Sequence, residues 1–328
     1  MSRRGVFYFI DFLCFYNYTE EIVIGCFVLL PYSALFSHII IMIGIFDSGL
    51  GGLTVLKEIK KVLPEYDYLY LGDTLHLPYG NRSDGGVYDL TKNACDYLFE
   101  QGCKLIIIAC NTATAKALRK LQTEYLKERQ TAQGEQVNIL GVVRPMVEAV
   151  AKIGKKKVGV IGTRGTVNSK IYMLELKEQR ENQDSSVKLQ EQQAVKNKFE
   201  IFQNSCPLLV PLIEEGWLKR KELKSILRYY LRPLKSAQVE VLILGCTHYP
   251  LLLEQIKNIM GRRCQVPNPG EIVAKSLKDY LQRHSEIENG LEKNSQTKYL
   301  VTDLNDNFQQ LARRFLGQEI EIRQIDLK

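Results

Sequence analysis

Short apolar runs alternate with helix-length segments along most of this 328-residue chain. The runs have the length of buried strands, and they lie at 43–46, 68–71, 105–109, 138–142, 157–161, 208–212 and 241–244. Between several of them, apolar residues recur at three- and four-residue spacing, as in Leu53, Leu56, Ile59 and Leu63. Strands that alternate with helices predict an α/β architecture with mainly parallel sheets that are covered on both faces.

The first forty residues do not share this alternation. Residues 22–42 contain no Asp, Glu, Lys or Arg and are long enough to span a membrane. However, a strand-like run follows at Ile43 without a linker, Pro31 interrupts the segment, and no small-residue cleavage site marks a signal peptide. We therefore expect residues 1–41 to be an extension outside the fold, with Met42 as the actual start. A membrane anchor is the alternative reading, and we do not expect it.

Composition excludes several classes of protein. Eight cysteines without any C-x-x-C and four dispersed histidines indicate neither a zinc site nor a redox pair, and they suit reduced thiols in the cytoplasm. The net charge of +7 is modest, and the densest basic run, KIGKKK at 152–157, is interpreted as a solvated helix end. No nucleic-acid partner is therefore expected.

Two cysteines end strand-like runs that lie in different halves of the chain. Cys110 ends LIIIA and precedes the polar pair NT, which suits a helix N-cap, and Cys246 ends VLILG and precedes TH. The unpaired N–H groups and the dipole at a helix N-terminus favour a thiolate. The repeated arrangement therefore predicts two reactive thiols.

Two thiols on opposite sides of a flat carbanion can protonate it on either face. One waits as a thiolate and the other as a thiol, and each turnover exchanges the two states. Such chemistry needs no metal or cofactor, and the sequence has no good motif for either. Four other cysteines are interpreted as packing residues, since free cysteine is usually buried: Cys95, Cys103, Cys206 and Cys264.

Two further polar segments follow strand-like runs. Residues 43–56, IGIFDSGLGGLTVL, place Asp47 at the sheet edge where α/β proteins bind ligands, although a plain glycine turn is the alternative. These glycines match neither the dinucleotide-binding motif nor the P-loop. Pro78, Tyr79 and Gly80 predict a turn that is either structural or able to hold a carboxylate through N–H groups and the Tyr79 hydroxyl. His76 is interpreted as a surface or packing residue.

Six strings in order resemble the glutamate racemases of the aspartate/glutamate racemase superfamily: DSGLGG, PYGNR, ACNTATA, GTRGTVNS, VPLIEEG and GCTHYPLL. The resemblance runs from about Met42 to Lys328, and the ordered set is far more specific than any single string. It implies two pseudo-symmetric, doubly wound α/β domains with the active site at their interface. One domain is expected to combine 42–137 with 267–328, and the other to span 138–266.

The resemblance also implies roles for individual residues. Cys110 is expected to act on D-glutamate and Cys246 on L-glutamate, with Asp47, His248 and Glu214 as ionisable helpers. The residues expected to hold the amino and carboxylate groups of the substrate are Asp47, Ser48, Pro78, Tyr79, Gly80, Asn111, Thr112, Thr163, Thr166, Thr247 and His248. No cofactor and no metal are expected.

The implied activity is a cofactor-independent interconversion of L- and D-glutamate in the cytoplasm. Its D-glutamate would serve peptidoglycan synthesis, and hence cell wall biogenesis and cell shape. Two alternatives are a racemase of the same superfamily acting on another amino acid such as aspartate, and a non-catalytic regulatory binding protein. The histidine of GCTH argues against the first, since aspartate racemases typically carry Glu there, and the paired cysteines argue against the second. Glutamate is the expected partner, and the sequence leaves a homodimer open.

Overall fold

The computed structural model describes residues 41–133, 136–186 and 199–327, all of which belong to one compact unit. Apart from Ile41, the expected extension at residues 1–41 lies outside the described residues. Ile41 is half-buried, and its carbonyl accepts a 2.9 Å hydrogen bond from the backbone N–H of Glu292. No helix in the described ranges is long and apolar enough to cross a membrane.

The larger sheet contains six parallel strands in the order β4-β3-β1-β2-β8-β9. Its strands are β1 (Met42–Asp47), β2 (Tyr68–Gly72), β3 (Cys103–Ile108), β4 (Asn138–Gly141), β8 (Thr297–Val301) and β9 (Ile322–Gln324). Helices of this part of the chain are α1 (Leu53–Val62), α2 (Asp84–Glu100), α3 (Asn111–Lys120), α4 (Leu126–Gln133), α12 (Pro269–Arg283), α13 (Ser285–Glu288) and α14 (Asp306–Leu316).

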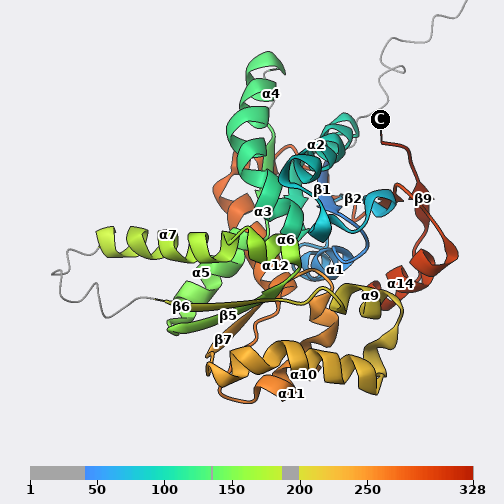
Figure 1. Cartoon of the computed structure of the whole chain (residues 1–328). Helices are drawn as coiled ribbons and strands as arrows, with labels where there is room; N and C mark the ends of the chain where they lie inside the picture. Colours follow the sequence, from blue (N-terminus) through green and yellow to red (C-terminus); the bar gives the residue numbers. More distant parts are fainter. Residues whose placement is uncertain (1–40, 134–135, 187–198, 328) are drawn as a thin grey trace, which may run out of the picture. The chain divides into compact units, whose positions relative to one another are not determined.

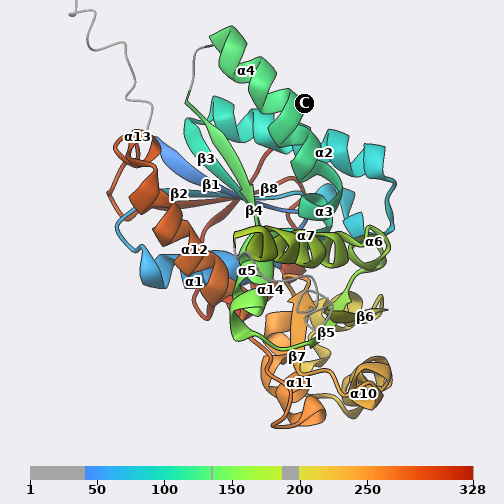
Figure 2. The same ribbon diagram turned by 90° about the vertical axis from the view of Figure 1, so that its left-hand side faces the viewer.

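Two layers of helices cover the larger sheet, as Figures 1 and 2 show from two directions. Ile43 and Ile45 of β1 share a core with α1 and α12, whereas Phe46 shares a core with α2 and α3. Successive side chains of a strand point to opposite faces, so both faces of β1 are buried. Burial on both faces explains why the sequence of β1 is a continuous apolar run and does not alternate with polar residues.

The smaller sheet contains three parallel strands in the order β6-β5-β7. Its strands are β5 (Lys157–Gly162), β6 (Glu200–Ser205) and β7 (Val241–Gly245). Its helices are α5 (Val143–Ile153), α6 (Arg164–Asn168), α7 (Ile171–Ser186), α9 (Leu209–Glu214), α10 (Lys221–Ser236) and α11 (Leu253–Met260). Val158 and Val160 pack with α5 and α7, and Leu244 packs in the core that includes α10, on the lower side of this sheet in Figure 1.

The predicted α/β architecture with parallel sheets is confirmed. The predicted helix with apolar residues at 53, 56, 59 and 63 is α1, which ends one residue earlier, at Val62. Its buried face contains Leu53, Leu56 and Ile59, as the spacing indicates.

One predicted strand is wrong. Residues 208–212 belong mainly to helix α9, in which Pro211 lies in the first turn, where its missing N–H group leaves no hydrogen bond unmade. The strand of this region is β6 instead, whose sequence EIFQNS holds only two strongly apolar residues and whose side chains stay largely half-buried. A strand of that composition offers no apolar run to detect. Strands β8 and β9 were likewise not predicted.

The expected boundary at residues 137 and 138 falls just before β4. This strand pairs with β3 and therefore lies in the larger sheet, although its residues fall within the range 138–266. The register joins Asn138 to Leu105 and Gly141 to Ile108. The change from one sheet to the other thus follows β4, and the division into two domains stays a prediction.

Candidate active site

Residues at the carboxyl ends of strands from both sheets line a pocket of about 260 Å³. Twelve predicted site residues line it: Ser48, Pro78, Tyr79, Gly80, Cys110, Asn111, Thr112, Thr163, Glu214, Cys246, Thr247 and His248. Two more predicted residues are hydrogen-bonded to this lining, since Asp47 accepts from Thr247 and Thr166 contacts Thr112. In parallel α/β sheets this edge is the usual place for ligands. The pocket therefore unites residues that are far apart in the sequence.

Cys110 connects β3 to α3 and is itself the N-cap of that helix. Its sulfur accepts a hydrogen bond from the backbone N–H of Ala113 and donates one to Ser48 Oγ, each at 3.4 Å. Burial, followed by the nearby Asp47 carboxylate, raises the pKa of the thiol to about 12, although the hydrogen bonds with Ser48 and Ala113 oppose the shift. These surroundings favour the thiol form of Cys110, although the helix N-terminus was expected to favour its thiolate.

Asp47 lies at the end of β1 and is fully buried. Its carboxylate accepts hydrogen bonds from the backbone N–H of Gly49 at 3.0 Å and from Thr247 Oγ1 at 3.2 Å. Burial raises the pKa of Asp47, and the positive charge of His248 and these hydrogen bonds oppose the rise. Because Thr247 follows β7, the contact joins the ends of strands from both sheets.

Cys246 follows β7 and lies beside a histidine that is paired with an acid. His248 Nδ1 is 3.9 Å from the Cys246 sulfur, and its Nε2 is 3.0 Å from Glu214 Oε1. Burial lowers the pKa of His248, but the interactions with Cys246 and Glu214 outweigh it and raise the pKa to about 10. The imidazolium is thus stabilised next to the sulfur.

No α-helix begins directly after Cys246. A 3₁₀ turn at Tyr249–Leu252 comes first, and α11 begins only at Leu253. The expected helix N-terminus is therefore absent at this second cysteine. The positive charge that it would have supplied comes from His248 instead, so the two thiols have different electrostatic surroundings.

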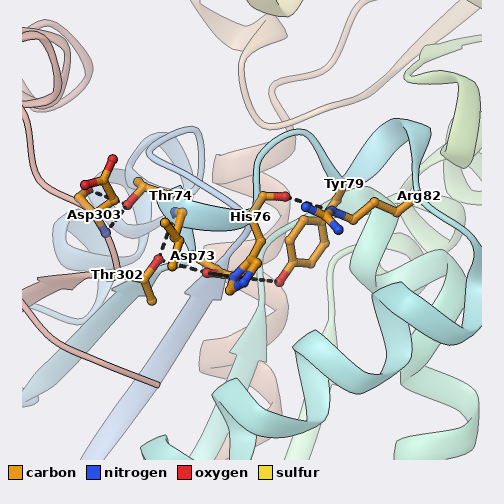
Figure 3. A network of polar contacts seen from close by, with 8 residues as sticks. Asp73, Thr74, His76, Tyr79, Arg82, Thr302 and Asp303 are labelled. Carbon is orange, nitrogen blue, oxygen red and sulfur yellow. Dashed lines mark hydrogen bonds and ion pairs between the residues drawn. The ribbon is translucent and has the colours of Figure 1, made fainter. Parts of the chain in front are cut away.

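A buried network holds the Pro78–Gly80 turn (Figure 3). Asp73 is fully buried, and it accepts hydrogen bonds from the Tyr79 hydroxyl at 2.6 Å and from Thr302 Oγ1 at 2.8 Å. His76 Nδ1 lies 2.8 Å from the same carboxylate, so this histidine has a polar partner rather than a packing role alone. Because the Tyr79 hydroxyl donates to Asp73, it is already engaged, and the backbone of the turn is what remains for the expected substrate contacts.

Hydroxyl groups link the two sheets across the pocket. Thr112 Oγ1 lies 2.9 Å from Thr163 Oγ1 and 3.3 Å from Thr166 Oγ1. Thr163 caps helix α6 by accepting a hydrogen bond from the backbone N–H of Thr166. Asn111 Oδ1 accepts a 2.6 Å hydrogen bond from Tyr172, which leaves its amide N–H groups as the donors of that side chain.

Sequence reasoning missed eight residues of the pocket lining: Leu77, Asn81, Arg164, Cys206, Pro207, Val210, Pro211 and Gly245. Arg164 is the only Lys or Arg among the described lining residues, and its position in the string GTRGTVNS was the available signal. The four cysteines interpreted as packing residues are all buried. Cys206 nevertheless lines the pocket, so a buried cysteine can also form part of the site.

The described part of the chain offers no cluster that suits a metal ion. Within residues 41–133, 136–186 and 199–327, no group of three or more His, Cys, Asp or Glu side chains could hold one. What the pocket does contain is two thiols, a histidine with an acidic partner, a buried carboxylate and several neutral donors. These groups are suited to moving protons and to binding carboxylates.

Comparisons with known proteins agree with this chemistry. The family model described as Asp/Glu/Hydantoin racemase matches residues 57–276. A glutamate racemase of Aquifex aeolicus is 37% identical over 281 residues, which cover 85% of this chain and 95% of that protein. The crystal structure of a glutamate racemase isoform from Bacillus anthracis has a TM-score of 0.72 and 32% identity, and it covers 87% of this chain and 97% of that one.

A second solved structure includes a ligand. The glutamate racemase from Francisella tularensis, in complex with D-glutamate, has a TM-score of 0.71 and 30% identity over 87% of this chain and 97% of that one. Taken with the fold and the pocket, the matches show that the chain belongs to the Asp/Glu/hydantoin racemase family. It is an amino-acid racemase.

Proposed function

We propose that this protein interconverts L- and D-glutamate, with Cys110 and Cys246 as the two acid/base groups. The observation that carries the proposal is that both thiols line one pocket, at the ends of strands from different sheets. A racemase needs a proton acceptor on one face of the α-carbon and a proton donor on the other. The two cysteines can supply that pair.

The assignment of acid and base follows from the surroundings of each thiol. Cys110 is the proton donor, because burial and Asp47 raise the pKa of its thiol to about 12. Cys246 is the base toward L-glutamate in our scheme, because its sulfur lies 3.9 Å from Nδ1 of His248, whose pKa is raised to about 10. Deprotonation of L-glutamate therefore starts from the Cys246 side.

In the L-to-D direction, the Cys246 thiolate takes the α-proton and leaves a planar carbanion next to the substrate carboxylate. The Cys110 thiol then donates its proton to the other face, and D-glutamate leaves. Cys110 is now the thiolate and Cys246 the thiol, so the reverse direction begins from Cys110. Each cycle moves protons only, with no net transfer of electrons.

The α-proton of an amino acid is a weak acid, so the carbanion needs stabilisation. We assign the substrate carboxylates and amino group to Ser48, Asn111 and Thr247, together with the backbone of the Pro78–Gly80 turn and the threonines Thr112, Thr163 and Thr166. Donors that are already fixed by the fold stabilise developing charge without reorganisation. Arg164 adds positive charge to the pocket lining, which favours a dicarboxylate substrate.

The biological role follows from the product. We propose that the D-glutamate is used for peptidoglycan synthesis in the cytoplasm. We also propose that the two sheets belong to two domains. The first combines 42–137 and 267–328 and also includes β4, and the second is the rest of the range 138–266. Substrate discrimination against aspartate depends on pocket length, and the D-glutamate bound to the Francisella tularensis relative supports the longer substrate.

The test is incubation of the purified protein with L-glutamate in D₂O. We expect deuterium at the α-carbon, detected by NMR, and D-glutamate, detected by chiral chromatography, to appear together. Activity should survive treatment with a chelator and removal of pyridoxal phosphate. Parallel reactions with L-aspartate serve as the control. A faster reaction with aspartate, or no exchange with either amino acid, would contradict the proposal.

A further inference from the structure

A second cavity, of about 830 Å³, lies between α10 and α11 and shares no lining residue with the racemase pocket. Both helices lie on the lower side of the smaller sheet in Figure 1. Seven of the twelve residues that line this cavity are Lys or Arg, and none is Asp or Glu. We call this cavity the basic groove.

Five of the cations form a stripe along α10, at Lys221, Lys224, Arg228, Arg232 and Lys235. Their spacing of three or four residues places them on one face of the helix. The opposite face is apolar and is buried in the protein core, so the stripe is turned outward. Fourteen residues of helix rise about 21 Å, which sets the length of the stripe.

The charge of the stripe is not compensated by the protein. Among the described residues, Lys221, Lys224, Arg228 and Arg232 take part in no ion pair, and all four are exposed. Like charges at such spacing destabilise a helix. The groove thus gathers seven cations in one concave site that has no acidic residue in its lining.

The arrangement of the cations bears on what the groove can bind. They follow one another along about 21 Å of helix, which suits a flexible polyanion that can follow the row. A membrane surface is a poor fit, because the apolar face of α10 is already buried and cannot enter a bilayer.

We propose that the basic groove binds the phosphate backbone of single-stranded nucleic acid. Consecutive cations of the stripe are about 5 Å apart along the helix, which suits repeated phosphate groups. Tyr229 is 73% exposed and lies next to Arg228 and one helical turn from Arg232, so its ring is available for base stacking. The proposal is independent of the racemase reaction.

This site departs from our expectation of no nucleic-acid partner. That expectation considered contiguous basic runs such as KIGKKK, whereas the stripe is dispersed through KRKELKSILRYYLRPLK and becomes continuous only on a helix. The structure also adds Lys219 and Arg220, which precede α10, and the concave shape that α11 completes.

The test is fluorescence anisotropy of the full-length protein with a labelled thymidine oligonucleotide of about 16 nucleotides. Five phosphate contacts predict a slope of log affinity against log salt of about −3.5 between about 50 and 200 mM salt. Arg228→Glu/Arg232→Glu should lower affinity at least about tenfold and reduce the slope by about 1.4. Arg228→Gln/Arg232→Gln should also weaken binding. This neutral variant replaces the charge-reversed one in the test if the latter fails to fold.

The matched control is Lys275→Glu/Lys278→Glu, which makes the same charge change at exposed positions of α12. It should bind the oligonucleotide nearly as well as the wild type, and thermal melting should show that all variants are folded. The proposal is overturned if the wild type does not bind at low salt or if the control loses as much affinity. Tighter binding to duplex DNA, polyglutamate or phosphatidylglycerol vesicles than to the oligonucleotide would also overturn it.

Discussion

His248 Nε2 lies 3.0 Å from Glu214 Oε1, and the two residues come from different elements on the same side of the pocket. The contact orients the imidazole so that its other nitrogen faces the Cys246 sulfur at 3.9 Å. The interactions with Glu214 on one side and with Cys246 on the other both raise the pKa of His248. Glu214 is therefore linked to Cys246 through the His248 imidazole.

Glu214→Gln should lower the pKa of His248 from about 10, because it removes a negative partner of the imidazolium. The alkaline limb of kcat/KM for L-glutamate should then move to lower pH. Glu215→Gln is the matched control, since Glu215 is adjacent in sequence but exposed. Superimposable pH profiles for Glu214→Gln and the wild type would show that Glu214 has no such role.

His248 should also make stability depend on pH. Its pKa is about 10 in the folded protein and 6.5 as the ordinary value, so folding favours the protonated form. The resulting stabilisation is complete below about pH 6.5 and is lost as the pH rises towards 10. Urea unfolding of the wild type and His248→Asn should show a difference that shrinks over this interval. A difference in unfolding free energy that grows with pH would contradict this prediction.

Gly51 leaves room for the side chains of Thr247 and His248. A Cβ at this position would lie 2.3 Å from Thr247 Oγ1 and 2.5 Å from His248 Nδ1. Gly51→Ala should therefore displace both side chains and lower kcat markedly. Gly85→Ala is the control, because a Cβ there meets nothing within 4 Å. Equal activities in the two variants would show that the close approach is not needed.

Asp73 should affect substrate binding without touching the substrate. Asp73→Asn removes a carboxylate that accepts hydrogen bonds from Tyr79 and Thr302, so we expect about 3 kcal/mol of destabilisation and a higher KM for glutamate. Thr302→Val removes the hydrogen bond from Thr302 to Asp73, which does not involve the Pro78–Gly80 turn. It should lower the free energy of unfolding by about 1 kcal/mol and leave the KM unchanged. An unchanged KM in Asp73→Asn, measured beside urea unfolding, would exclude the positioning role.

Local patterns were sufficient to predict the fold class and the places of the two thiols. Alternating apolar runs predicted the strands β1, β2, β3, β4, β5 and β7, because each contains a short apolar run. All of them except the half-buried β4 are almost wholly buried. Cys110 and Cys246 could be singled out because each ends such a run. Strand β6 could not be found, since its polar residues are held in place by pairing with β5.

Long-range contacts account for most of what the sequence did not show. Asp73 follows β2 without a distinctive motif, and its importance depends on Thr302, 229 residues away. The different surroundings of the two thiols also depend on contacts between residues that are far apart in the sequence. The repeated motif suggested that both lie at helix N-termini, whereas only Cys110 caps a helix and Cys246 depends on His248.

The most direct measurement of the two-thiol scheme is the racemisation rate of Cys110→Ala and Cys246→Ala, each assayed with L- and with D-glutamate. Both thiols are needed in every turnover, so each variant should lose about 10²–10⁴-fold in rate in both directions. Cys206→Ala is the matched control, because this buried cysteine lines the same pocket and has no assigned proton transfer. Full activity of either Cys110→Ala or Cys246→Ala would contradict the account.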